Sequence, residues 1–202
     1  MEETSGGNST YHGVDAFFDA DPRSNLHFFF NFAGEAANFT TYVVGGPLDA
    51  CGTITNPASG CTFYNNLPVS YVPNYTLNTG VYYGIQHNGR VFLEPRFWVQ
   101  STGSQHLWNN NNGGEPSSQT MPSYTTANLS FNAPISLWEK QSINLRVDMM
   151  NIANSQYNEW AYISSGGYYA ALAPDPNNPP SGYINAYPGA PRSIYGTISY
   201  QF

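Results

Sequence analysis

The last ten residues, 193–202, constrain the fold of this chain more than any other stretch. Alternate positions form two sets of side chains. One set is apolar or aromatic, with a glycine at 196, and contains Ile194, Ile198, Tyr200 and Phe202. The other carries hydroxyls or an amide and contains Ser193, Tyr195, Thr197, Ser199 and Gln201. A strand places alternate side chains on opposite faces, so this stretch predicts a two-faced strand. Chain ends usually fray, so a water-soluble protein gains little stability from aromatic residues at its terminus. A membrane barrel must close on its last strand, where Tyr200 and Phe202 would lie in the interfacial aromatic girdle.

The composition is poor in charge without being strongly apolar. Charged residues make up 9% of the 202 residues, against roughly 25% in a typical soluble domain. No run of 18 apolar residues is present, which excludes a transmembrane helix. The net charge of -7, with six Lys and Arg, argues against a nucleic-acid partner. Composition alone leaves a membrane barrel and a secreted β-sandwich equally open.

The two-residue alternation recurs along the chain and predicts about seven strands. They lie near residues 11–20, 26–35, 75–86, 91–100, 125–135, 143–149 and 193–202. Asn88-Gly89 predicts a tight hairpin turn, because both residue types accept a positive φ. No segment has the helical period, so the prediction is an all-β protein.

Charges in these segments all lie on the face opposite the apolar one. Six of them would line the lumen of a barrel: Asp15, Asp19, Glu94, Arg96, Arg146 and Asp148. A charge facing lipid at mid-depth costs roughly 2–4 kcal/mol, which explains such a segregation. The outer face of a sandwich would usually carry more Lys and Glu. The charge pattern therefore favours the barrel.

The lengths of the connections favour the same architecture. Short connections alternate with long irregular ones, at 21–25, 87–89 and 137–141 against 41–72, 103–122 and 151–191. Short periplasmic turns and long extracellular loops are typical of an antiparallel up-and-down transmembrane β-barrel, whose strands run about ten residues. Bacterial single-chain barrels have an even number of strands. Seven strands therefore imply either an eighth strand that the pattern misses or an incomplete barrel.

Four stretches resemble the TonB-dependent outer-membrane receptors, and they occur in the order found in that family. They are Tyr11-His-Gly-Val-Asp15, the run from Leu67 to Asn78, the run from Leu145 to Tyr157, and Pro188-Gly-Ala-Pro-Arg-Ser-Ile-Tyr-Gly196. They resemble a strand opening, the entry to a late strand, the penultimate strand with its exit, and the final strand. The aromatic end resembles the terminus that insertion machinery reads, although the usual glycine is displaced by one position.

This resemblance implies that residues 1–202 are the C-terminal segment of a barrel of ~22 strands, with the plug domain and the TonB box outside this chain. The implied function is a part in energised uptake of a siderophore, a glycan or a similar ligand across the bacterial outer membrane. The implied partners are outer-membrane lipid, the rest of the barrel, the plug, the barrel-assembly machinery, and the TonB complex through the missing N-terminal part. Two alternatives stay open: a small eight-stranded barrel acting as an adhesin or anchor, and a secreted sugar-binding β-sandwich.

Two further sets of residues are candidates for sites. Cys51 and Cys61 lie in one predicted extracellular loop without His or Cys at metal-ligand spacing, which favours a disulfide over a metal site. Loop aromatics beside asparagines are candidate ligand-binding residues, although they would equally pack the loops together: Trp108, Trp160, Tyr162, Tyr168, Tyr169, Tyr183 and Tyr187. No catalytic triad order, phosphate loop or dinucleotide fingerprint is present. We therefore expect no enzymatic activity, no cofactor and no metal.

Overall fold

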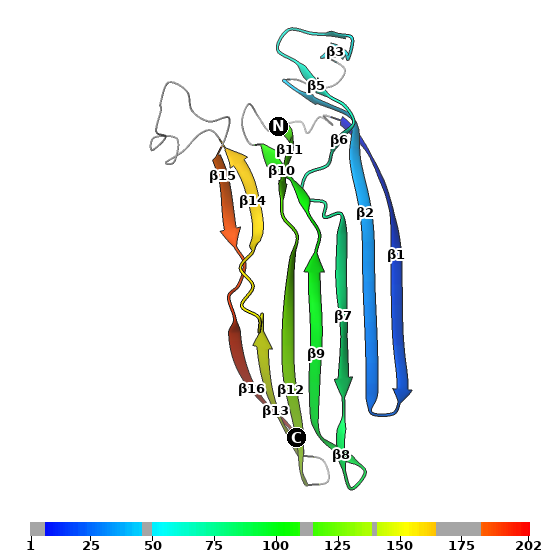
Figure 1. The fold of residues 1–202 in the computed structure, drawn as a ribbon, viewed down its shortest axis with the longest axis vertical. Helices are drawn as coiled ribbons and strands as arrows, with labels where there is room; N and C mark the ends of the chain where they lie inside the picture. The colour runs from blue at the N-terminus through cyan, green and yellow to red at the C-terminus, as the bar shows by residue number, and fades with distance from the viewer. Residues whose placement is uncertain (1–6, 46–49, 110–114, 139–140, 165–182) are drawn as a thin grey trace.

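The computed structural model describes residues 7–45, 50–109, 115–138, 141–164 and 183–202. Every regular element within these ranges is a β-strand (Figure 1). No helix suited in length and apolarity to crossing a membrane occurs among them. The prediction of an all-β, antiparallel architecture is confirmed, apart from one parallel pair in the loops.

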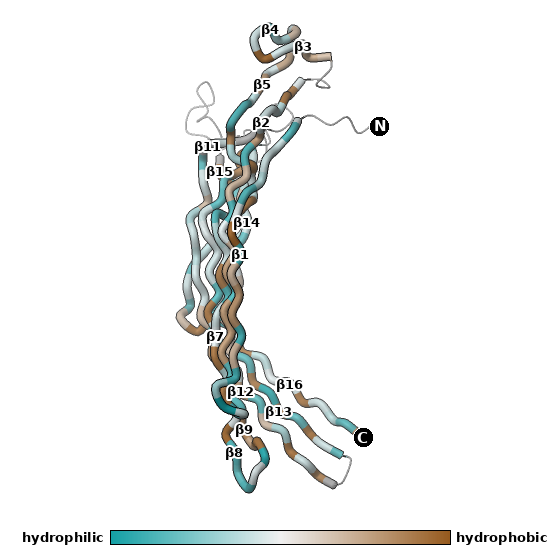
Figure 2. The backbone as a smooth tube through the Cα atoms, turned by 90° about the vertical axis from the view of Figure 1, so that its right-hand side faces the viewer, coloured by the Kyte–Doolittle hydropathy of each residue, from teal (hydrophilic) through white to brown (hydrophobic). Residues whose placement is uncertain are grey.

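One large antiparallel sheet organises the molecule. Its path runs through seven long strands, which are β1 (Gly7–Arg23), β2 (Leu26–Val44), β7 (Tyr75–Tyr83), β9 (Arg90–Thr102), β12 (Tyr124–Trp138), β13 (Gln141–Met150) and β16 (Ser193–Gln201). Seen from the side, the sheet is a single curved layer (Figure 2). The path begins at β1 and ends at β16, and no pairing joins these two strands within the described ranges. The sheet is therefore open.

Several strands are longer than the ten residues expected. β1 has 17 residues, β2 has 19, β9 has 13 and β12 has 15. The ladder of β1 and β2 continues to Gly7 and Tyr42, well beyond the amphipathic part of either strand. Ladder hydrogen bonds use backbone groups that every residue except proline carries, so a side-chain pattern does not report where pairing stops.

The short connections at 24–25 and 88–89 form tight turns at one end of the sheet (Figure 1). Asn88 has a φ of 51° and Gly89 a φ of 73°, so the predicted turn is confirmed, and it joins β8 (Ile85–His87) to β9. Pro95 lies inside β9 although it lacks an N–H. On one side it faces Phe131, and on the other it falls where β9 changes partner from β7 to β8. The missing donor therefore lies at a natural break in the ladder.

The prediction that the long connections are irregular is wrong. The first contains β3 (Gly52–Thr53), β4 (Asn56–Pro57), β5 (Thr62–Tyr64) and β6 (Leu67–Pro68), and the last two pair with β2. The second and third contain β10 (Gln105–Asn109), β11 (Glu115–Met121), β14 (Asn158–Ser164) and β15 (Tyr183–Pro188). These four strands form a second sheet in the order β11-β10-β14-β15, in which β10 and β14 are parallel. Figure 1 shows this sheet at the end opposite the tight turns.

A small apolar core belongs to this second sheet. It consists of Leu107, Met121, Ala161 and Ile163, each at most 3% exposed. Ser70 and Tyr71 fasten the chain before β7 to the same sheet, because Ser70 Oγ donates to Leu107 O over 2.9 Å and Tyr71 N–H donates to His106 O over 3.0 Å. The long connections are thus held together as one packed unit.

Candidate functional site

One face of the large sheet carries an unbroken apolar row. Cross-strand partners share a face, and the six pairings between the seven neighbouring strands align a single line of side chains. That line is Ala20, Phe28, Val81, Phe97, Leu129, Met149 and Ile194. None of the seven is buried, and Phe28 and Phe97 are 40% and 41% exposed. A row of this length that nothing in the described chain covers is unusual for a water-soluble surface.

The opposite face carries a polar row immediately beside it. Its members cross six strands, from β2 to β16, and are His27, Tyr82, Arg96, Ser130, Asp148 and Tyr195. Alternate residues on a strand share a face, so Glu94 lies on the face of Arg96, and Arg146 on that of Asp148. Asp19 faces Phe29, two residues from His27, and Asp15 follows four residues away on β1. All six charges predicted for the lumen therefore share one face of the sheet.

His27 is the centre of the acidic end of this face. Its Nδ1 lies 2.7 Å from Asp21 Oδ1, and its Nε2 lies 3.3 Å from Asp19 Oδ2. The ring of Tyr82 stacks on the imidazole with centroids 4.3 Å apart. A cavity of about 500 Å³ opens beside this group and is also lined by Glu94 and Arg96. The arrangement places two largely exposed carboxylates beside one imidazole on the polar face.

Arg96 is held by aromatic rings rather than by a carboxylate. Its guanidinium carbon lies 5.2 Å from the ring centroid of Phe29, 5.6 Å from that of Tyr82 and 5.5 Å from that of Trp98. These are cation–π distances, and a planar guanidinium suits such stacking better than an ammonium does. Farther along the same face, Arg146 donates from Nε to Asp148 Oδ1 over 2.9 Å. Arg96 and Arg146 thus differ, because within the described ranges only Arg146 of the two has a carboxylate partner.

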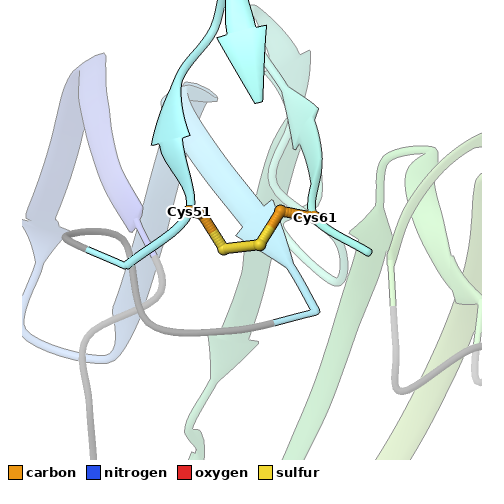
Figure 3. Close-up of a disulfide and its surroundings, with 2 residues drawn as sticks. All are labelled: Cys51 and Cys61. Atoms are coloured by element: carbon orange, nitrogen blue, oxygen red, sulfur yellow. A yellow bond between two sulfur atoms is a disulfide. The ribbon is translucent and has the colours of Figure 1, made fainter. Parts of the chain in front are cut away.

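The structure contains a disulfide between Cys51 and Cys61 (Figure 3). The two Cα atoms are 5.6 Å apart, and Cys51 is completely buried. The bridge closes the segment that holds β3 and β4, which extends beyond the sheet at the end of the long connections (Figure 1). A covalent bridge holds this small segment together where few apolar contacts are available.

The structure brings three of the seven candidate ligand-binding aromatics together. Trp160 and Tyr162 lie on β14, and the ring centroids of Trp160 are 5.1 Å from those of both Tyr162 and Tyr187. Trp108 lies on β10, and its ring contacts Tyr42 on β2 edge-on at 5.7 Å. The other three are placed only in part: Tyr183 begins β15, and Tyr168 and Tyr169 lie outside the described residues.

Tyr71 joins this group and was not among the predicted residues. Its ring lies 5.7 Å from that of Trp160, which completes a loop ring cluster of Tyr71, Trp160, Tyr162 and Tyr187. Burial raises the pKa of Tyr71 above the ordinary 10.0, although hydrogen bonds from the backbone of Trp108 and the side chain of Trp160 oppose the shift. Tyr71 has a φ of 64° and lies in a segment without alternation. The sequence contains no signal that would have singled it out.

The described residues include no group of three or more His, Cys, Asp or Glu side chains placed to hold a metal ion. Among the described residues, three side-chain oxygens are buried without a hydrogen-bond partner. They belong to Asn65, Asn78 and Asn144. Asn78 and Asn144 line cavities on the polar face, where their acceptors can be met by water or by another polar group.

No protein-family model matches this chain, and a search of the curated proteins finds no match either.

Proposed function

We propose that this chain is the C-terminal segment of an outer-membrane transport barrel of the TonB-dependent receptor type. The observation that carries the proposal is the seven-residue apolar row on one face of the sheet. The six charged side chains described above all lie on the opposite face. Lipid is the surrounding that suits the apolar row. Each Phe or Leu of the row would gain roughly 1.5–3 kcal/mol on complete transfer from water to an apolar medium.

The polar face then lines the interior of the barrel. An interior position suits the two carboxylates at His27, the ring-bound Arg96 and the unused acceptors of Asn78 and Asn144, because all of them need polar partners. In the proposed receptor, those partners are water and a plug domain that another part of the protein supplies. The energy-transducing TonB complex would act through that other part.

The open edges of the sheet support an incomplete barrel. Unpaired N–H and C=O groups cannot be left in hydrocarbon, so β1 and β16 each need a neighbouring strand. In the proposed barrel the missing strands fill the gap between these two edges. The long connections, with the loop ring cluster and the disulfide-closed segment, would face the cell exterior and contact the transported ligand.

The test is a topology map of the full-length protein in a Gram-negative host. An epitope tag inserted at Ile54, in the disulfide-closed segment, should bind antibody on intact cells. The same tag inserted between Asn88 and Gly89 should bind only after the outer membrane is permeabilised, because the two sites lie at opposite ends of the sheet (Figure 1). Detergent-free solubility of the protein, or equal labelling of both tags on intact cells, would contradict the proposal. Solubility would instead favour a secreted β-sandwich.

A further inference from the structure

A groove of about 590 Å³ lies where the large sheet meets the second sheet. It is lined by residues 122–124 and 154–158 and by Pro188, Gly189 and Pro191. These segments come from the start of β12, the connection between β13 and β14, and the connection between β15 and β16. The volume falls within the range of small-molecule sites.

Two stacked tyrosines form part of the groove wall. The rings of Tyr124 and Tyr157 are 4.2 Å apart and inclined by 17°. Gly189 packs against Tyr157, and a Cβ at this glycine would overlap the ring. Burial raises the pKa of Tyr157, and the neighbouring Tyr124 and Glu159 raise it further, while a backbone hydrogen bond from Ala190 opposes the shift. The stacking and the contact with Gly189 restrict how the Tyr157 ring can turn.

Asn151 fixes the shape of the groove from behind. Its side-chain Nδ2 donates to Ser155 O over 2.9 Å and to Ala190 O over 3.1 Å, and its Oδ1 accepts from Ser155 N–H over 2.9 Å. Its own N–H donates to Asn128 Oδ1 over 2.9 Å. Asn151 is 3% exposed and has a φ of 50°, a conformation that asparagine tolerates better than most residues. Asn151 thus joins the two connections through its side chain and ties them to the large sheet through its backbone N–H, before any ligand arrives.

The described residues that line the groove carry amides and hydroxyls but no carboxylate, ammonium or guanidinium. The side chains of Asn154, Gln156 and Asn158 are exposed along it, and an amide offers both donors and an acceptor. The Oδ1 of Asn154 already accepts a hydrogen bond from Arg192 N–H over 3.2 Å, so Asn154 offers chiefly its Nδ2 as a donor. Glu159 and Arg192 are the ionisable residues next in sequence to the lining, and neither lines it. An anionic chelate would call for charged donors, such as the bidentate guanidinium of arginine. The lining suits an uncharged ligand with many hydroxyl groups and an apolar ring face.

The groove also connects two surfaces already described. Asn158 and Pro188 are cross-strand partners, and the next pair along the same two strands is Trp160 and Tyr187 of the loop ring cluster. On the other side, Tyr124 faces Thr102 in the row that leads to Asp15 on the polar face. A ligand held in the groove would therefore lie between the loop aromatics and the polar face of the sheet.

We propose that this groove is a binding site for a neutral oligosaccharide, with sugar rings packed on the Tyr124–Tyr157 pair and hydroxyls bonded to the amides of Asn154, Gln156 and Asn158. The inference deepens the proposed function and rests on it for the statement that this sugar is the transported ligand. Binding itself is a property of the groove and is measured separately from transport.

The test is isothermal titration of the full-length detergent-extracted protein with neutral hexasaccharides of α-linked glucose, β-linked glucose, xylose and mannose. Hexagalacturonate and a ferric catecholate complex serve as anionic probes. At least one neutral sugar should bind, and both anions should bind at least tenfold more weakly. Gln156→Leu should weaken sugar binding about three- to tenfold, as expected for one lost hydrogen bond to an uncharged group. Gln119→Leu, an exposed amide on β11 outside the groove, should leave binding unchanged.

Failure of every neutral sugar to bind would overturn the inference, and so would binding that Gln156→Leu and Gln119→Leu alter equally. Tighter binding of either anion would overturn it as well. The topology map separates these outcomes from failure of the proposed function. A protein that spans the outer membrane but binds only the ferric complex refutes the sugar site and keeps the transport proposal. A soluble protein that binds the sugar through Gln156 refutes the transport proposal and keeps the site.

Discussion

The most direct test of the membrane assignment is a pair of arginine substitutions at neighbouring positions of β2. Phe30 lies on the apolar face, where its cross-strand partners are Phe18 and Thr79. Asn31 lies on the polar face and lines the cavity that also contains Asp19 and Glu94. Phe30→Arg and Asn31→Arg therefore introduce the same charge on opposite faces of one strand.

The depth of Phe30 follows from its distance to the tight turn. It is four residues from Leu26, and strand rise gives about 13 Å along the strand, or about 10 Å along the membrane normal at a tilt of ~40°. The apolar band of a barrel is about 25 Å tall, so this position is near the middle. An arginine there costs roughly 2–4 kcal/mol, which is roughly a 30- to 800-fold loss in the folding equilibrium.

The assay is assembly of the full-length protein in outer membranes, followed by heat-modifiable mobility and protease resistance. Phe30→Arg should abolish or strongly reduce the folded form, whereas Asn31→Arg should assemble, because its guanidinium can reach Asp19. In urea unfolding, Phe30→Arg should lose roughly 2–4 kcal/mol of stability, and Asn31→Arg should lose less than that. Equal tolerance of both substitutions would refute the assignment of the faces, and so would a greater loss at Asn31.

Four further predictions concern other parts of the chain. Gly80→Ala should destabilise the sheet by roughly 1–3 kcal/mol in urea unfolding, because its Cβ would lie 2.6 Å from a carbonyl oxygen of β9. Gly196→Ala, which meets nothing within 4 Å, is the matched control and should be neutral. Cys61→Ser should make the segment around β3 and β4 sensitive to protease by removing roughly 2–3 kcal/mol of loop closure, while heat-modifiable mobility stays unchanged. Above pH 10, the unfolded chain releases the Tyr71 proton before the native protein does, so stability should fall as pH rises through the raised pKa. Tyr71→Phe should lessen that alkaline loss in thermal melts, and an unchanged pH profile would contradict the role of burial. The chain expressed alone should neither close nor conduct in liposomes, and a stable monomeric channel from these residues would instead support the small-barrel alternative.

The local features of the fold could be predicted from the sequence because they depend on near neighbours. Alternation of side chains determined which residues of β2, β9 and β16 share a face, since a strand turns successive side chains to opposite sides. Asn88 and Gly89 specified a turn, because few other residue pairs accept positive φ at both positions. The segregation of charge was visible for the same reason, and the register of the sheet then aligned these faces across seven strands.

The tertiary structure alone decided how the long connections fold. β10 and β14 pair through backbone groups, which are the same for nearly all residues, and the paired segments lie some fifty residues apart. Neither segment has an amphipathic pattern that would have revealed its partner. Tyr124 and Tyr157 likewise meet only because the strand pairing and the buried amide of Asn151 bring their segments together. Sequence therefore determined which side chains each strand presents to either face. Contacts between distant segments created the groove, and the sequence did not reveal them because they depend on the folded path of the backbone.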